Sequence, residues 1–261
     1  MEVSRLGFGL FQLGTLEGQD GIKKADRLVN AGIDAGINFL DTAACYGVSE
    51  ELIGAAVAHR REEYILATKC GHAVGNTTRQ PWTAQIVKES IDRSLRRLQT
   101  DHLDIVQIHS CDLDVLERGE IVEALSDAKR LGKTRFIGYS GDNEAALWAV
   151  ESDMFDTLQT SLSLVDQHAR TNLLGPAEAR GMGIIIKRPI GNAAWGNDKA
   201  PNSPATYFDR ARAMASMGPV PSAPDDPILL ALGFVFAHKE VDTAIVGTTN
   251  LTHLRSNIEM L

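Results

Sequence analysis

The feature that most constrains the fold is an alternation of short apolar runs with longer amphipathic segments along the whole chain. Most of the short runs are near-continuous apolar stretches, as expected of parallel strands that are buried on both faces. Between them, apolar residues recur at helical spacing, as in Ile86, Ile91, Leu95 and Leu98. The predicted strands cover residues 5–10, 37–41, 64–69, 103–109, 134–140, 155–160, 183–188 and 243–247.

Eight strands that alternate with helices indicate either a closed (β/α)8 barrel or a large open doubly wound sheet. The first strand is not followed by the GxGxxG sequence that marks dinucleotide-binding open sheets. A length of 261 residues suits one barrel domain. We therefore predict an α/β protein, a TIM barrel that forms a single domain over residues 1–261.

One segment, at about residues 191–226, breaks this rhythm. It is rich in Pro, Ala, Asn and Gly, and six of the nine prolines of the chain fall at positions 201 to 227. A loop of this length usually covers or shapes a site, although a solvated insertion without function is the alternative. Because the segment follows the seventh strand, we expect it over the C-terminal mouth, where Trp195, Tyr207 and Phe208 would be wall residues or would pack the loop onto the barrel.

Composition and charge narrow the class of partner. The formal net charge is −8 and the basic residues are scattered, which argues against a nucleic-acid or anionic membrane partner. The three cysteines form no CxxC pair, and neither a signal-like N-terminus nor a long apolar run is present. These features predict a cytoplasmic protein with no membrane partner. The oligomeric state is not readable from the sequence.

Four chemically active residues fall at the ends of three consecutive strands. Asp41 ends the second strand and leads to Tyr46, Lys69 ends the third, and His109 ends the fourth. Taken singly, each has an ordinary structural explanation such as capping, packing or solvation. Barrel active sites lie at the C-terminal ends of the strands, so all four are expected at one mouth, and this coincidence favours catalysis.

The group has a clear chemical logic. A phenol has a pKa of about 10, and a nearby ammonium such as that of Lys69 is expected to lower the pKa of Tyr46. Asp41 would keep Lys69 charged, and His109 would orient a substrate carbonyl against the Tyr46 hydroxyl. Such a site polarises C=O and delivers a proton. It contains no activated nucleophile, so a hydride from a nicotinamide cofactor is the natural reductant.

A metal site is a competing interpretation of the same region. Cys45, Cys70, Cys111 and His109 all fall near strand ends, and these residue types bind zinc in metal-dependent barrel hydrolases. Each cysteine lies next to, or two residues from, one of the four residues above, so strand alternation would often turn it away from the mouth. No HxH pattern or carboxylate cluster supports a metal, and we predict none.

Longer motifs around the four residues resemble the aldo-keto reductase signature. Residues 36–47 read GINFLDTAACYG, followed by Ser49, Glu50, Glu51 and Gly54, while residues 67–69 and 104–109 read ATK and DIVQIH. The resemblance runs from Arg5 to Asn257. It implies a (β/α)8 barrel that binds extended NADPH across its C-terminal mouth, and a catalytic tetrad that is matched by Asp41, Tyr46, Lys69 and His109.

The same resemblance implies further cofactor contacts. Ser140 and Gln159 match residues that hold the nicotinamide carboxamide, whereas Gly141 stands where Asn is usual. Lys187 occupies the position of a Tyr that stacks on the nicotinamide in many relatives, so Lys187 or Arg188 would approach the pyrophosphate instead or remain solvated. The adenosine-phosphate segment corresponds to Gly247, Thr248, Thr249, Arg255 and Asn257, a strand, turn and helix N-terminus suited to phosphate.

Thr249 takes the position where relatives often place a basic residue for the 2′-phosphate, and Arg255 follows a few residues later. The resemblance therefore implies a preference for NADP(H), with NAD(H) as the alternative. The predicted function is NAD(P)H-dependent reduction of an aldehyde or ketone to an alcohol, with a small-molecule carbonyl substrate. A cofactor-sensing regulatory subunit with the same barrel is the alternative from another class.

Overall fold

In a computed structural model of the protein, which describes residues 1–75, 78–195 and 205–260, the strands form one closed parallel barrel in the order β1 to β8. The strands are β1 (Leu6–Gly9), β2 (Phe39–Asp41), β3 (Ile65–Cys70), β4 (Leu103–His109), β5 (Thr134–Ser140), β6 (Thr157–Ser161), β7 (Gly183–Lys187) and β8 (Thr243–Val246). Pairing of β1 with both β2 and β8 closes the ring. The predicted TIM barrel is confirmed.

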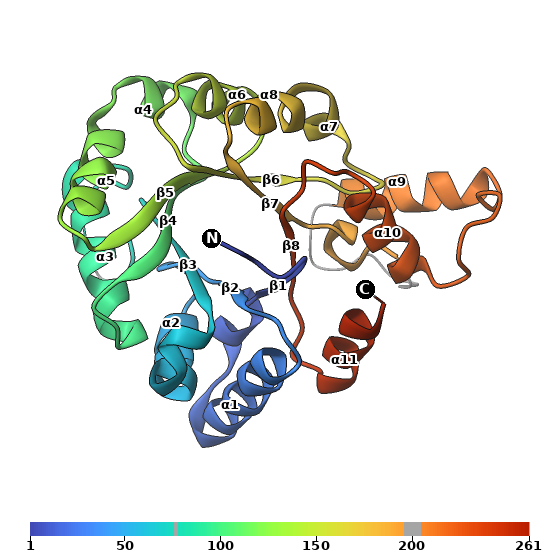
Figure 1. Cartoon of the computed structure of the whole chain (residues 1–261), viewed down its shortest axis with the longest axis horizontal. Coiled ribbons are helices and arrows are strands. Elements are labelled where there is room, and N and C mark those ends of the chain that lie inside the picture. The colour runs from blue at the N-terminus through green and yellow to red at the C-terminus, as the bar shows by residue number, and fades with distance from the viewer. Residues whose placement is uncertain (76–77, 196–204, 261) are drawn as a thin grey trace.

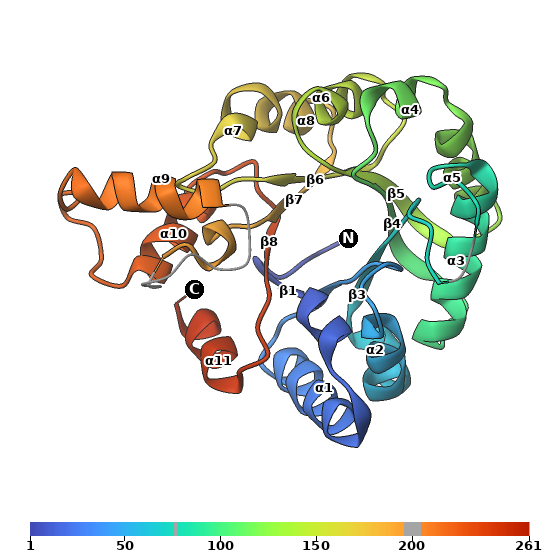
Figure 2. The same cartoon turned by 180° about the vertical axis from the view of Figure 1, so that it is seen from behind.

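Helices follow the strands and surround the ring, as Figure 1 and the reverse view in Figure 2 show. The α-helices are α1 (Gly18–Asp34), α2 (Ser49–Val57), α3 (Ala84–Leu98), α4 (Leu113–Glu117), α5 (Glu120–Arg130), α6 (Asn143–Glu151), α7 (His168–Asn172), α8 (Leu174–Ala179), α9 (Ala205–Ser216), α10 (Pro227–Phe236) and α11 (Leu251–Glu259). Three 3-10 helices, η1 (Phe11–Thr15), η2 (Ala58–Glu63) and η3 (Gly191–Ala193), complete the described elements.

Two layers of apolar side chains hold the barrel together. The larger lies between the strands and the surrounding helices and includes Phe8, Leu66 and Val106, which have no more than 1% of their surface exposed. A smaller cluster built around Phe39 and Ile105 lines the inside of the ring toward the N-terminal ends of the strands. Burial on both faces explains why the strands read as continuous apolar runs.

All the strand boundaries agree with the sequence predictions to within two residues. The last strand ends at Val246 and not at Gly247, and β7 ends at Lys187 and not at Arg188. Arg188 has φ +58°, a left-handed conformation that is incompatible with continuing a strand. This bend turns the chain out of the barrel just before the segment at 191–226.

The segment at 191–226 is not a continuous loop, because it contains η3 and the helix α9. Tyr207, Ala211 and Met214 of α9 pack against Val165 and Trp195. Figure 1 shows α9 outside the ring of strands, near α10, with its axis directed away from the barrel centre. Residues 196–204 of the predicted loop lie outside the described residues.

Within the described part of the chain, no helix combines the length and apolar character that crossing a bilayer requires.

Candidate active site

The four predicted catalytic residues meet at the C-terminal ends of β2, β3 and β4. The Nζ atom of Lys69 lies 2.6 Å from Oδ1 of Asp41 and donates a second hydrogen bond to the carbonyl oxygen of Thr42 at 2.8 Å. The same ammonium is 5.1 Å from the centroid of the Tyr46 ring. Tyr46 and His109 stand edge to face with centroids 5.8 Å apart. The four residues that the sequence placed near strand ends therefore lie together in space.

Close approach of two glycines shapes the turn that carries Tyr46. A Cβ atom on Gly14 would lie 2.2 Å from the carbonyl oxygen of Tyr46, and a Cβ on Gly47 would lie 2.3 Å from the carbonyl oxygen of Gly14. Gly47 also has φ +53°. Only glycine at both positions lets η1 press against this turn, which brings Phe11 edge to face with Tyr46 at 4.9 Å between centroids.

The direction of the pKa shift of the Tyr46 phenol differs from the sequence expectation. Burial raises the pKa of Tyr46 above its ordinary value, and the attraction of Lys69 for the phenolate only partly opposes this effect. The expected lowering of the pKa is thus wrong in net direction, because removal of the ring from water outweighs the neighbouring ammonium. The phenol keeps its proton at neutral pH and is available as a proton donor.

Lys69 is charged and His109 is neutral at neutral pH. Burial lowers the pKa of Lys69, but the negative charge of Asp41, the nearby Tyr46 and the hydrogen bond to Asp41 together outweigh it and leave the pKa above its usual value. Burial, together with the repulsion from Lys69, lowers the pKa of His109 to about 2. The site therefore holds an ammonium, a neutral imidazole and a neutral phenol side by side.

A hydrogen-bonded chain joins the predicted carboxamide-binding residues to this ion pair. Ser140 Oγ donates to Gln159 Oε1 at 2.8 Å, and Gln159 Nε2 donates to Asp41 Oδ2 at 2.8 Å. All three side chains are at most 2% exposed, and Asp41 in turn holds Lys69. The sequence placed Ser140 and Gln159 near the site but gave no sign that they brace the carboxylate of Asp41.

A steric contact explains why position 141 is a glycine. A Cβ atom there would lie 2.3 Å from the hydroxyl oxygen of Tyr139, a buried side chain whose hydroxyl donates to the carbonyl oxygen of Cys111 at 2.8 Å. The Asn that is usual in relatives therefore does not fit this backbone. Gly141 has no side chain to offer, and its N–H already donates to the carbonyl oxygen of Gln159 at 3.0 Å.

Lys187 and Arg188 share an acidic partner that sequence reasoning missed. Lys187 Nζ lies 2.9 Å from Asp142 Oδ2, and Arg188 Nη1 is 3.5 Å from the same oxygen and 3.1 Å from Ser161 Oγ. With 13% of its side chain exposed, Lys187 is not a solvated strand-end charge. Asp142 lies two residues beyond the end of β5, so only an inspection extended past the strand ends would have found it.

The adenosine-phosphate segment forms the turn between β8 and α11. Thr248 Oγ1 accepts a hydrogen bond from the N–H of Asn250 at 3.0 Å, and the side chain of Asn250 caps α11 by accepting from Thr252 N at 2.8 Å. Arg255 is exposed on α11, whereas Asn257 is only 8% exposed. Thr249 lies immediately before Asn250, the N-cap residue of α11.

A cavity of about 630 Å³ joins most of these features, but the predicted cofactor-binding residues Thr248, Thr249, Arg255 and Asn257 do not line it. Its lining includes Asp41, Tyr46 and His109 at one side, Ser140, Gln159, Lys187 and Arg188 along β5 to β7, and Gly247 at the end of β8. Its volume is typical of pockets for small molecules and cofactors. The start of the unusual segment, at Ile190, Asn192 and Ala193, also borders it.

The three aromatic residues proposed as walls pack elsewhere. Trp195 and Tyr207 belong to the apolar cluster under α9, and the Tyr207 hydroxyl donates to Asp166. Phe208 lies under the guanidinium of Arg212, 4.9 Å from its ring centroid. Trp195 and Tyr207 thus pack the segment against Val165, Phe208 contacts a residue of its own helix, and none of the three lines the cavity.

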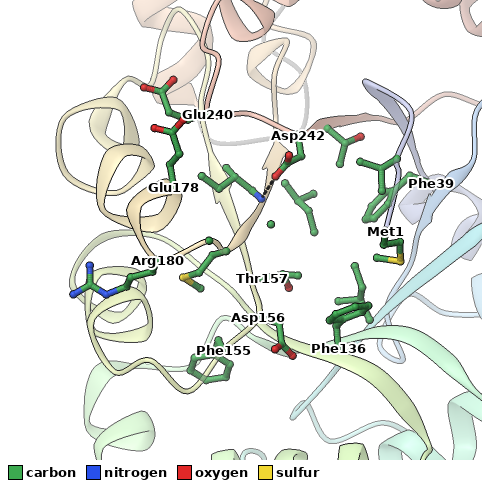
Figure 3. A pocket seen from close by; sticks show the side chains of 18 of the residues that line it. Met1, Phe39, Phe136, Phe155, Asp156, Thr157, Glu178, Arg180, Glu240 and Asp242 are labelled. Carbon is green, nitrogen blue, oxygen red and sulfur yellow. Dashed lines mark hydrogen bonds between the residues drawn. The ribbon is translucent and has the colours of Figure 1, made fainter.

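A second cavity, of about 700 Å³, lies at the opposite end of the barrel (Figure 3). It is lined by residues at the N-terminal ends of strands, such as Phe39 and Thr157, and by Glu178, Arg180 and Asp242 around its rim. None of the predicted site residues lines it. Figure 3 shows Asp242 hydrogen-bonded to the backbone, through the N–H of Ile184 at 2.7 Å.

The cysteine-based zinc site that the sequence left as an alternative is not assembled. Cys70 and Cys111 are buried in the apolar layer between strands and helices. Cys45 alone among the cysteines reaches the mouth, where its Sγ lies 3.4 Å from Nδ1 of His109. Burial raises the pKa of the Cys45 thiol.

Comparison with known proteins agrees with this geometry. The sequence profile of the Aldo/keto reductase family matches residues 5–261, and the chain belongs to this family. It is 30% identical to L-galactose dehydrogenase from Arabidopsis thaliana, over 99% of this chain and 84% of that protein. It is also 30% identical to 6-dehydroglucose reductase from Novosphingobium aromaticivorans, over 99% and 86% of the two chains.

Among solved structures, the holo form of an aldo-keto reductase from Bacillus halodurans superposes with a TM-score of 0.84. The two chains are 27% identical, and the match covers 99% of this chain and 86% of that one. The chain is thus an oxidoreductase of the aldo-keto reductase class, whose general activity is NAD(P)H-dependent carbonyl reduction.

Proposed function

We propose that this protein reduces an aldehyde or ketone to an alcohol with NAD(P)H, and that Tyr46 donates the proton. One observation supports this proposal most strongly. The buried Nζ atom of Lys69 lies 2.6 Å from Oδ1 of Asp41 and 5.1 Å from the centroid of the Tyr46 ring. A bound nicotinamide cofactor supplies the hydride. The roles of the chain's own residues follow from their charge and position.

Tyr46 and His109 act on the carbonyl oxygen. The neutral imidazole of His109 donates a hydrogen bond and orients the carbonyl, and the Tyr46 hydroxyl transfers its proton as negative charge develops on the oxygen. Lys69 stabilises the phenolate that remains, because its charge lies close to the ring in a site from which water is largely excluded. Asp41 keeps Lys69 charged and pointed at the ring.

The cavity suits an extended dinucleotide. Ser140 and Gln159 would hold the carboxamide, and Lys187 and Arg188, which line the cavity, would face the pyrophosphate. Thr248 and Thr249 stand with backbone N–H groups at the N-terminus of α11, where a phosphate is favoured. Arg255, exposed on the same helix, would pair with a 2′-phosphate and give a modest preference for NADPH over NADH.

Cofactor absorbance measured with a panel of aldehydes and ketones tests the proposal. NADPH oxidation that depends on the carbonyl compound is expected, and it should persist in the presence of a chelator because no step uses a metal. The panel should include sugars and oxidised sugars, since two relatives are named for L-galactose and 6-dehydroglucose. Cofactor binding without turnover on any carbonyl compound would instead favour a cofactor-sensing subunit.

A further inference from the structure

Three metal-binding side chains converge beside the proposed catalytic group. One ligand atom each from Cys45, His72 and His109 lies within 4.8 Å of the other two. Cys45 comes from the turn after β2, His72 from the segment after β3, and His109 from the end of β4. His72 takes no part in the proposed reduction, and sequence reasoning did not select it.

The spacing is close to that of a zinc site. Zn–S and Zn–N bonds of about 2.3 and 2.0–2.1 Å at tetrahedral angles place a sulfur and a nitrogen ligand about 3.6 Å apart. Cys45 Sγ and His109 Nδ1 are 3.4 Å apart, so this pair already has the spacing of two ligands of one ion. The upper limit of 4.8 Å for the group leaves only about an ångström of side-chain movement for the third ligand.

Surrounding contacts hold His72 and His109 against each other. Their rings meet edge to face with centroids 4.8 Å apart, and Trp82 lies 5.1 Å from the His72 ring. Trp82 is anchored twice, because Nε1 donates to the carbonyl oxygen of His109 at 3.0 Å and its backbone N–H donates to Gly71 O at 2.6 Å. A Cβ on Gly71 would lie 2.7 Å from the Trp82 ring, so glycine is needed for this arrangement.

We propose that Cys45, His72 and His109 form a binding site for a borderline-soft divalent cation such as Zn²⁺, which inhibits the reductase reversibly. Two imidazoles and a thiolate are a ligand set that zinc favours, and a water would complete the tetrahedron. The ammonium of Lys69, whose charge acts on both Cys45 and His109, is paired with the carboxylate of Asp41 at 2.6 Å. A bound ion holds the His109 ring as a ligand, so that the ring no longer orients the substrate carbonyl. It also places a dication beside Tyr46, where the carbonyl oxygen must enter.

Direct metal binding tests the site without reference to activity. Co²⁺ titrated into the protein at neutral pH is expected to give the visible bands of a tetrahedral ion and a thiolate charge-transfer band, and Zn²⁺ should displace it. Loss of one ligand in His72→Ala should weaken Zn²⁺ binding by at least about tenfold. Cys45→Ser should abolish the charge-transfer band. His102→Ala and Cys111→Ser are matched controls that should bind as the parent protein does.

The inhibition rests on the proposed function, so it is measured separately. Micromolar Zn²⁺ should slow carbonyl reduction, a chelator should restore it, and the rate of His72→Ala with Zn²⁺ should equal that variant's own metal-free rate. Co²⁺ spectra that lack a thiolate band, or Zn²⁺ affinity unchanged in both His72→Ala and Cys45→Ser, would overturn the metal site. Binding by these three residues without any carbonyl reduction would uphold the site and contradict the proposed function alone.

Discussion

Replacement of Lys69 by Met should destabilise the protein by about 3–5 kcal/mol at pH 7, because it leaves the Asp41 carboxylate buried without its counter-ion. The two side chains are 1% and 2% exposed and 2.6 Å apart, so almost no water reaches the charge that remains. For a protein of this size the loss corresponds to a melting temperature lower by roughly 6–20 °C.

The size of this penalty should depend on pH in a defined way. A buried carboxylate can escape its charge by taking up a proton, which costs an ordinary aspartate about 1.4 kcal/mol for each pH unit above roughly 3.9. The charge penalty in Lys69→Met is therefore limited to about 4 kcal/mol at pH 7 and about 1.5 kcal/mol at pH 5. Relative to the parent protein, the variant should thus be less impaired in mild acid.

Urea unfolding at both pH values measures the effect. The double variant Asp41→Asn/Lys69→Met should recover most of the lost stability, because it removes both charges. Lys129→Met is a matched control, since the Lys129–Asp156 pair has the same 2.6 Å separation but side chains that are 39% and 31% exposed. It should cost less than about 1 kcal/mol. Equal losses in Lys69→Met and Lys129→Met, or no pH dependence, would refute the reasoning.

Three further predictions concern the mouth of the barrel. Because the pKa of His109 is lowered to about 2, its ring stays neutral throughout the assay range, and kcat should show no imidazole titration between about pH 5 and 8; a break near 6.5 would contradict the assigned state. Gly141→Asn should cost about 1–3 kcal/mol, because its Cβ would meet the Tyr139 hydroxyl, whereas Gly175→Ala, with open space around it, should be tolerated in the same unfolding assay. Arg255→Ala should raise the Kd for NADPH by roughly tenfold and leave that for NADH nearly unchanged in a fluorescence titration; equal effects on both cofactors would remove Arg255 from 2′-phosphate recognition.

The barrel and the central site could be predicted because both depend on local sequence signals. Strands buried on two faces must be apolar throughout, so they stand out, and Asp41, Lys69 and His109 mark the points where three of them end. Parallel strands in a closed ring bring these ends to one mouth. Convergence of the four residues thus follows from topology once the barrel is recognised.

The features that could not be predicted depend on how deeply side chains are buried and on contacts between residues that are distant in the sequence. The pKa of Tyr46 results from competition between burial and Lys69, and the winner is visible only when the depth of the ring is known. The pairing of Lys187 with Asp142 joins β7 to the residues after β5, which no spacing in the chain encodes. Helix α9 was missed because the Pro- and Gly-rich composition around it favours loops, and only its packing on Val165 and Trp195 reveals its apolar face.

The most direct test of the central claim is the Tyr46→Phe variant, which removes one hydroxyl group and keeps the ring. Steady-state NADPH oxidation with a carbonyl substrate should show kcat lower by roughly 10²–10⁴-fold, because the proton donor is lost. The Kd for NADPH, from fluorescence titration, should change by less than about twofold, since the cofactor contacts remain. A variant that reduces the carbonyl at the full parental rate would contradict the account.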